Sequence, residues 1–186
     1  MTRSAAILVG TLLVASHAWA QQPLSVGDSG VQAAIQKTFP GSTILVAADV
    51  DSRECGPAPE SPGFVAGDFE GDGRPDFAAL VKIGETGKVV DWEGRKLHET
   101  RYAFAIFLAT SDGRYNPKRI IRFLEYWPVM TFITLQPPGM LRGPGDDRRG
   151  SAITLKSPGV ELINCGKSSV VYYFSNKYVR EFWTSD

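Results

Sequence analysis

The apolar pattern that follows Pro40 restricts this chain to a β-rich fold. Short segments rich in β-branched and aromatic residues recur there, and Gly, Pro, Asn and Asp separate them. This arrangement is typical of strands joined by tight turns. The segments that show it are residues 43–48, 64–69, 76–83, 102–110, 118–125, 129–135, 152–155, 160–163, 170–174 and 178–184. We therefore predict a predominantly antiparallel β structure built from meandering hairpins.

One helix is expected before these strands. Ser29 and Gln32 have the S-x-x-Q spacing of a capping box at a helix N-terminus. Apolar residues then recur on one helical face: Val31, Ala34, Ile35 and Phe39. Pro40 and Gly41 end the pattern, because proline cannot continue a helix and glycine commonly follows one. The sequence thus predicts an α+β fold with a single N-terminal helix.

Local patterns add detail to this prediction. Residues 77–81 are continuously apolar, which favours a strand covered on both faces. Residues 175–177 predict a tight hairpin connection between the last two strands. Residues 52–62 and 137–150 are longer than turns require and are expected to be loops. The charged run at 146–149 in the second loop is interpreted as a solvated tip whose charges offset one another.

The composition excludes two broad classes of protein. The chain has 20 Lys and Arg against 20 Asp and Glu, and 43% of its residues are hydrophobic. A disordered chain would combine low hydrophobicity with a high net charge. A dedicated nucleic-acid-binding protein would carry an excess of basic residues. We expect a single folded domain over residues 21–186 that does not bind nucleic acid.

The first segment has the features of a secretory signal peptide, assigned to residues 1–20. Arg3 supplies the positive start, and residues 5–15 form an apolar run. Ala18, Trp19 and Ala20 then form a small-x-small cleavage site, so cleavage is expected after Ala20. The apolar run is too short to span a bilayer, and no later segment is long and apolar enough. A periplasmic or secreted location is therefore predicted.

Export changes the interpretation of the two cysteines. In an oxidising compartment, Cys55 and Cys165 are expected to form a disulfide. The alternative is a pair of free, buried thiols. Cleavage after Ala20 would also remove His17 and leave His98 as the remaining histidine. This excludes a zinc site with several histidines, and His98 itself is interpreted as a solvated loop residue.

A short acidic loop, residues 68–76, has the composition of a calcium site. Carboxylates occupy its first, third, fifth and ninth positions: Asp68, Glu70, Asp72 and Asp76. Calcium prefers six to eight oxygen ligands, and the carbonyl of Arg74 would add one. Gly71 and Gly73 allow the tight curl that such a loop needs. Without a cation, carboxylates that converge in this way would repel one another.

The same acidic residues have a second interpretation. Aspartate side chains in turns commonly accept hydrogen bonds from their own backbone, so the loop could be a self-capped hairpin without an ion. An EF-hand is not expected, because Ala79 stands where that loop has its bidentate glutamate and the flanking segments are predicted strands.

Residues 67–80 resemble the FG-GAP/VCBS-type repeat of integrin-like β-propellers and of many secreted bacterial proteins. In that family a loop of the form Gly-Asp-Phe-Asn-Gly-Asp-Gly-x-x-Asp-Leu joins two antiparallel strands and binds calcium. Residues 104–108 and 111–115 resemble the next strand and turn of such a blade. Glu70 departs from the usual Asn or Asp. The resemblance implies a structural calcium ion, and the single loop argues against a closed propeller.

These observations favour an exported, non-catalytic binding protein that engages a protein or an envelope component. Two pairs of aromatic residues, Tyr126–Trp127 and Tyr172–Tyr173, are candidates for an exposed contact surface. One alternative is an inhibitor of a secreted hydrolase such as lysozyme. A second alternative is a carboxylate-dependent glycosidase that uses the acids of the 68–76 loop. The crowding of those acids with glycines suits metal coordination better, and no enzymatic activity is predicted.

Overall fold

The computed structural model describes residues 24–144 and 152–185. The predicted signal peptide (1–20) and the charged run at 146–149 lie outside these residues. The helices are α1 (Ser29–Thr38), the 3-10 helix η1 (Ala47–Asp49) and α2 (Ser52–Cys55). The strands are β1 (Thr43–Ile44), β2 (Phe64–Gly67), β3 (Asp76–Trp92), β4 (Arg95–Ala109), β5 (Tyr115–Trp127), β6 (Thr131–Gln136), β7 (Gly139–Arg142), β8 (Ala152–Leu155), β9 (Gly159–Asn164), β10 (Ser168–Ser175) and β11 (Tyr178–Ser185).

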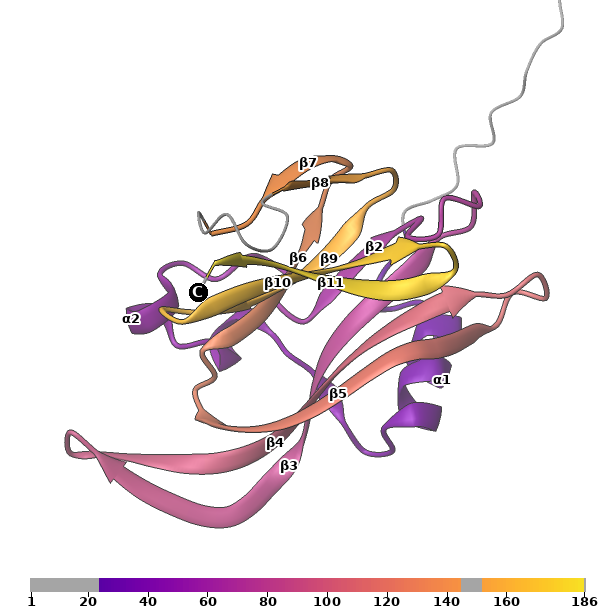
Figure 1. The fold of residues 1–186 in the computed structure, drawn as a ribbon. Helices are drawn as coiled ribbons and strands as arrows, with labels where there is room; N and C mark the ends of the chain where they lie inside the picture. The colour runs from indigo at the N-terminus through magenta and orange to yellow at the C-terminus, as the bar shows by residue number, and fades with distance from the viewer. Residues whose placement is uncertain (1–23, 145–151, 186) are drawn as a thin grey trace, which may run out of the picture.

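The strands form two main sheets and one small ribbon (Figure 1). The first sheet has the order β1-β3-β4-β5, and β2 also pairs with β3. The second has the order β11-β10-β9-β6, and β7 pairs with β8. The pairings between these strands are antiparallel. The predicted α+β class, mostly antiparallel β, is confirmed.

The first sheet is the middle layer of the molecule. Residues 77–81 of β3 are each 0% exposed, which confirms the prediction of a strand covered on both faces. Because side chains alternate along a strand, Phe77 and Val81 pack under α1, whereas Ala78 and Leu80 face the second sheet. The core is therefore divided between a helix–sheet layer and a sheet–sheet layer.

Each layer has its own apolar cluster. Under α1, Val31 and Ile35 pack with Phe77 and Phe107, whose stacked rings have centroids 4.5 Å apart. Between the sheets, Leu80, Phe104 and Ile106 pack with Ile133 and Tyr172 from the second sheet. Burial of these large side chains is the main source of stability in a fold of this kind.

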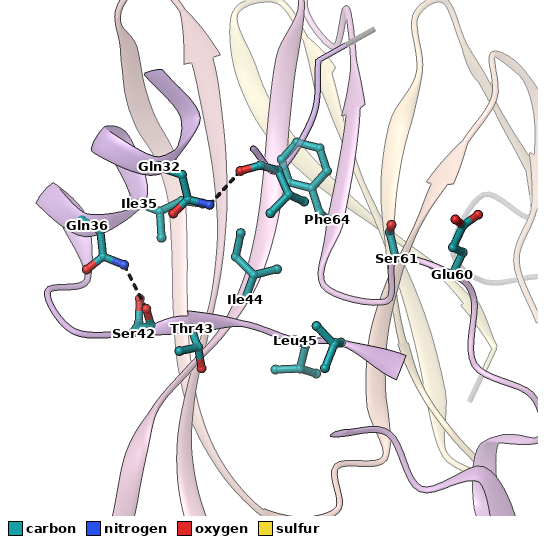
Figure 2. A pocket seen from close by; sticks show the side chains of 12 residues that line it. Gln32, Ile35, Gln36, Ser42, Thr43, Ile44, Leu45, Glu60, Ser61 and Phe64 are labelled. Carbon is teal, nitrogen blue, oxygen red and sulfur yellow. Dashed lines mark hydrogen bonds between the residues drawn. The ribbon is translucent and has the colours of Figure 1, made fainter. Parts of the chain in front are cut away.

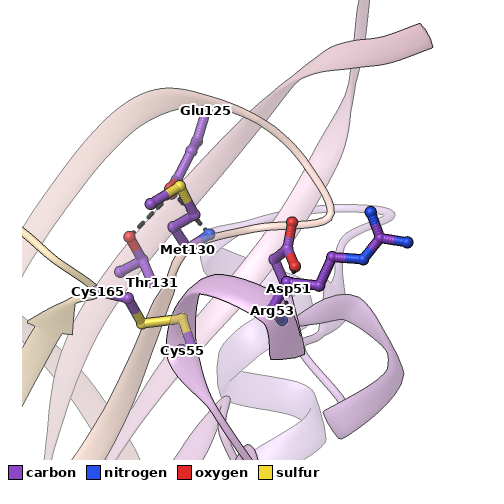
Figure 3. Close-up of a disulfide and its surroundings, with 7 residues drawn as sticks. All are labelled: Asp51, Arg53, Cys55, Glu125, Met130, Thr131 and Cys165. Carbon is purple, nitrogen blue, oxygen red and sulfur yellow. Dashed lines mark hydrogen bonds between the residues drawn. A yellow bond between two sulfur atoms is a disulfide. The ribbon is translucent and has the colours of Figure 1, made fainter. Parts of the chain in front are cut away.

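The sulfur atoms of Cys55 and Cys165 lie at disulfide distance, as predicted (Figure 3). Cys55 ends α2, and Cys165 lies in the turn between β9 and β10. The bridge joins residues 110 positions apart, with Cα atoms separated by 5.1 Å. It therefore attaches the segment before β2 to the second sheet.

The start of α1 differs from the predicted capping box. Asp28, not Ser29, is the N-cap residue, and it makes no side-chain capping bond. Instead, the Asp28 carboxylate accepts a hydrogen bond from the amide of Ser25, and Gln32 donates its side-chain amide to the carbonyl of Val26. The turn before the helix uses both groups, so the S-x-x-Q spacing does not form a box.

Several predicted boundaries were wrong. Strand β1 ends at Ile44 because η1 begins at Ala47, and the segments expected to be loops contain α2 and β7. The largest error concerns β3 and β4, which extend through residues 84–101. The predicted hairpin at 175–177 is confirmed, because Ser175 pairs with Tyr178 across a two-residue turn.

Candidate functional site

The acidic loop between β2 and β3 curls around the carboxylate of Asp68. That carboxylate accepts hydrogen bonds from the backbone amides of Gly71 at 2.8 Å, Asp72 at 2.9 Å and Gly73 at 2.7 Å. Gly71 and Gly73 have φ values of 74° and 84°, in the region that favours glycine. Three amides aimed at one carboxylate hold the loop closed.

The next two acids in the loop lie at its surface. Asp72 accepts a hydrogen bond from the backbone amide of Arg74 at 2.9 Å, and the Arg74 guanidinium forms an ion pair with the same carboxylate. Glu70 is exposed. Asp72 is therefore directed toward Arg74 and not toward the centre of the loop.

Asp76, the last acid of the loop, is buried at the start of β3 with 1% exposure. One carboxylate oxygen accepts the amide of Phe69 at 2.9 Å, and the other accepts the amide of Ala109 at 2.8 Å. Burial raises the pKa of Asp76 to about 6, while these two hydrogen bonds act in the opposite direction. Asp76 thus links the loop to the end of β4.

The five predicted ligand residues lie in one loop, but their oxygens do not converge on one point in this structure. In residues 24–144 and 152–185, no three His, Cys, Asp or Glu side chains are grouped closely enough to hold a metal ion. The carboxylates of Asp68 and Asp76 accept backbone amides, which is the self-capped arrangement of the second interpretation. The oxygen-rich composition still suits calcium, but Asp72 would have to exchange Arg74 for the ion.

The extended part of the β3–β4 hairpin is a second candidate site. We call residues 89–98 the arm, because β3 and β4 pair there beyond the end of β5, which stops opposite His98 (Figure 1). Trp92 is 58% exposed and Val89 46% exposed. Val90 pairs with Leu97, so these residues share one face of the ribbon with Trp92. The arm therefore presents apolar side chains outside the core.

Charged contacts hold the arm and its base in place. Arg95 lies 3.5 Å from Asp51, the residue before α2, and Lys88 lies 2.9 Å from Glu99. The hydrogen bond between Lys88 and Glu99 raises the pKa of the lysine and lowers that of the glutamate. His98 belongs to β4, not to a loop as predicted, and its Nδ1 is 3.4 Å from a carboxylate oxygen of Glu85.

The aromatic pairs chosen from the sequence have different surroundings. Trp127 is 40% exposed, and Tyr126 is half-buried. Tyr172 is buried at 5% exposure against Phe104, so its predicted role in an exposed surface was wrong. Sequence reasoning missed Trp92, although the residues Glu93 and Gly94 beside it are a hairpin signal.

A cavity of about 350 Å³ lies between α1 and β1 (Figure 2). Its walls are mainly apolar, and Glu60 is the titratable residue among those that line it. Gln36 donates its side-chain amide to the Ser42 carbonyl at 2.9 Å, and the Ser42 hydroxyl is buried without a hydrogen-bond partner among the described residues. The lining contains no nucleophile paired with a base, so the cavity does not suggest a reaction.

Glu125 forms a polar contact near the disulfide. Its carboxylate accepts the amide of Met130 at 2.9 Å and the hydroxyl of Thr131 at 2.8 Å (Figure 3). Burial raises the pKa of Glu125, and these hydrogen bonds partly offset that effect. The contact joins the end of β5 to the start of β6.

Within the described residues, no helix is long and apolar enough to cross a membrane.

The chain was also compared with known proteins. The comparisons with protein-family models, with curated proteins and with solved structures found no match for this chain.

Proposed function

We propose that this is an exported, non-catalytic binding protein whose arm contacts a partner protein or an envelope component. The observation that carries the proposal is the arm itself, where Trp92 is 58% exposed on a ribbon that β5 no longer covers. Large aromatic side chains are enriched at protein interfaces, and tryptophan is prominent among the residues that dominate binding energy. The apolar clusters of the core contain no residue of the arm.

The remainder of the fold supports the arm as a scaffold. The centre of the first sheet is covered on both faces, the disulfide attaches α2 to the second sheet, and Arg95 attaches the arm to Asp51. A binding surface on strands that continue from a rigid sheet keeps its shape better than one on a long loop.

A structural calcium ion in the 68–76 loop is the second part of the proposal. The side chains of Asp68, Glu70, Asp72 and Asp76 and the carbonyl of Arg74 would supply its oxygens. The support is chemical, because Asp76 buries a carboxylate whose pKa is raised by that burial, and a cation would offset the cost of the charge. Such an ion would hold two strands together and would take no part in a reaction.

The arm is tested by capture from an envelope extract. The mature protein carrying a photoreactive amino acid in place of Lys96, an exposed residue of the arm, is expected to cross-link a specific component, and each variant below carries the same photoreactive residue. Trp92→Ala should abolish capture, whereas Trp183→Ala, which removes a similarly exposed tryptophan from β11, should retain it. Equal capture by the unmodified protein and by Trp92→Ala would contradict the proposal.

Calcium is tested by isothermal titration calorimetry and thermal unfolding. Glu70→Gln is the most useful variant, since Glu70 is exposed and its loss should leave the ion-free loop unchanged. Calcium should raise the melting temperature of the unmodified protein more than that of Glu70→Gln. A flat titration, with unfolding unchanged by a chelator, would show that the loop is a self-capped hairpin.

A narrow arm is also consistent with inhibition of a secreted hydrolase. A two-stranded ribbon that ends in the Glu93–Gly94 turn could enter the substrate cleft of an enzyme such as lysozyme. This alternative predicts that lysozyme turnover falls in the presence of excess protein and recovers with Trp92→Ala. Unchanged turnover would remove it.

A further inference from the structure

Strand β5 is an unpaired edge of the first sheet. It pairs with β4 on one side, and no described strand pairs with its other side. An open edge presents backbone N–H and C=O groups that can accept another strand. Pro117 and the adjacent register shift protect the first part of β5, because proline lacks the N–H group. Residues 120–126 carry no such protection.

A groove of about 320 Å³ runs beside this unprotected part, between β5 and the second sheet. Ile121 and Phe123 of β5 line one side, and Tyr172 and Trp183 of the second sheet line the other. Trp183 is 50% exposed. A strand added to β5 would direct every second side chain into this apolar groove.

The other face of β5 is positively charged. Beyond the register shift, alternation places Arg122 on the face away from the groove, together with Ile120, which is 38% exposed. Lys118 is exposed and is the unpaired residue at the shift itself. The Arg122 guanidinium lies over the Phe39 ring of the α1 layer. Among the described residues, neither Lys118 nor Arg122 forms an ion pair. Side chains of a strand added along residues 120–126 would meet the cation of Arg122 on this face.

These charges argue against a second copy of the chain as the occupant. In an edge-to-edge pair, each strand would bring the unpaired cations of Lys118 and Arg122, whereas Arg119 already forms an ion pair with Glu181 of β11. The acid on β5, Glu125, already accepts hydrogen bonds from Met130 and Thr131. Like charges on paired strands are destabilising, so a partner with the opposite charge fits better.

We propose that β5 binds an extended peptide whose side chains alternate between apolar and acidic. The peptide would extend the first sheet along residues 120–126, with its apolar side chains in the groove and its carboxylates on the face that carries Arg122. Backbone hydrogen bonds would provide affinity, and the alternation would provide specificity. This site is separate from the arm and does not depend on the function proposed for it.

The probe is a short, fluorescein-labelled peptide that alternates valine and glutamate, blocked at both ends. Three control peptides isolate the three parts of the proposal. One has lysine for glutamate, one has the same residues in two blocks, and one is N-methylated at alternate backbone nitrogens. Fluorescence anisotropy should detect binding of the first peptide and at least about tenfold weaker binding of each control. In amide exchange, residues 120–126 should gain protection.

Two variants connect the binding to the groove and to the charged face. Trp183→Ala should weaken binding about tenfold, and its matched control, Tyr178→Ala, which removes a 67% exposed aromatic residue of the same strand outside the groove lining, should not. Arg122→Glu should reverse the preference from the glutamate to the lysine peptide. Its control is Arg142→Glu, which changes an exposed arginine on β7. The side chains of Arg122 and Arg142 are both exposed, so each substitution should retain the fold.

The proposal is overturned by any of four results. The first is no binding below about 1 mM. The second is equal binding of the glutamate, lysine and block peptides. The third is protection that appears outside β5 in amide exchange. The fourth is self-association of the chain through β5 in light scattering. Loss of arm-dependent capture with intact peptide binding would instead contradict the proposed function of the arm alone.

Discussion

The β3–β4 hairpin contains two regions with the same secondary structure and opposite surroundings. At residues 77–81, each side chain of β3 is 0% exposed between the α1 layer and the second sheet. In the arm, at residues 89–98, the same two strands pair only with each other except at His98, which also pairs with Trp127, and Trp92 is 58% exposed. Backbone pairing is common to both regions. The difference shows that burial, not strand pairing, decides which part stabilises the fold and which part is available to a partner.

Removal of the disulfide should have the largest effect on the free energy of unfolding. It should leave local opening of the arm unchanged. Cys55 and Cys165 are separated by 110 residues, so in the chain-entropy model their bridge contributes about 5 kcal/mol. We expect Cys55→Ser with Cys165→Ser to lower the free energy of unfolding in urea by about that amount. Amide exchange in the arm should change little, because the arm opens locally before global unfolding. A loss below about 1 kcal/mol would show that the bridge does not constrain the unfolded chain.

Truncation of a core ring should have the next largest effect. Phe77→Ala removes a fully buried ring stacked on Phe107 and should destabilise the protein by about 3–5 kcal/mol. Trp92→Ala removes a larger side chain from the same strand, yet it should change stability by less than about 0.5 kcal/mol. Chemical denaturation of both variants measures the contrast directly. Similar losses would mean that the arm contributes to the core.

Glu125 marks the boundary between the two regions, because it pairs with Thr100 just before the arm begins. Burial raises its pKa in the folded state above the value of about 4.3 in an unfolded chain. The folded state therefore binds the proton more tightly, and stability should fall as the pH rises from about 4.3 through the folded pKa. Glu125→Gln cannot ionise and should lose this part of the pH dependence. The measurement is the free energy of unfolding of both proteins from acid to neutral pH. Parallel curves for the two proteins would show that Glu125 does not contribute to the pH dependence of stability.

The buried region could be predicted from the sequence because its environment leaves a pattern. Continuous apolar residues at 77–81 indicate a strand covered on both faces, and the structure confirms it. The arm leaves no such pattern, because a ribbon that is not buried in the core on either face carries polar and apolar residues at either parity. Its one local signal is the turn at Glu93 and Gly94, which have positive φ values of 51° and 76°.

The acidic loop shows a second limit of sequence reasoning. The spacing from Asp68 to Asp76 places oxygen-bearing side chains in one tight loop, but the same oxygens can accept backbone amides or hold a cation. The groove beside β5 shows a third limit. Trp183 and Phe123 are distant in the sequence, and only the packing of the two sheets places them together.

The smallest expected effect comes from a pair of matched glycines, one in the arm and one in the connection after the packed part of β4. Gly94 in the arm turn and Gly113 in the β4–β5 connection both have a φ of 76°, and an added Cβ would meet nothing within 4 Å at either position. Alanine should therefore carry the same backbone strain of about 1 kcal/mol at both sites. Both variants should therefore lower the free energy of global unfolding by about 1 kcal/mol. In Gly94→Ala, local opening of the arm relieves the strain, so amide exchange at 89–98 should accelerate about fivefold. In Gly113→Ala, exchange at 89–98 should be unchanged, because opening of the arm does not relieve strain at that turn. If Gly94→Ala did not accelerate exchange in the arm, or if both variants accelerated it equally, the arm would open only with the core, and the distinction between the two halves of the hairpin would be lost.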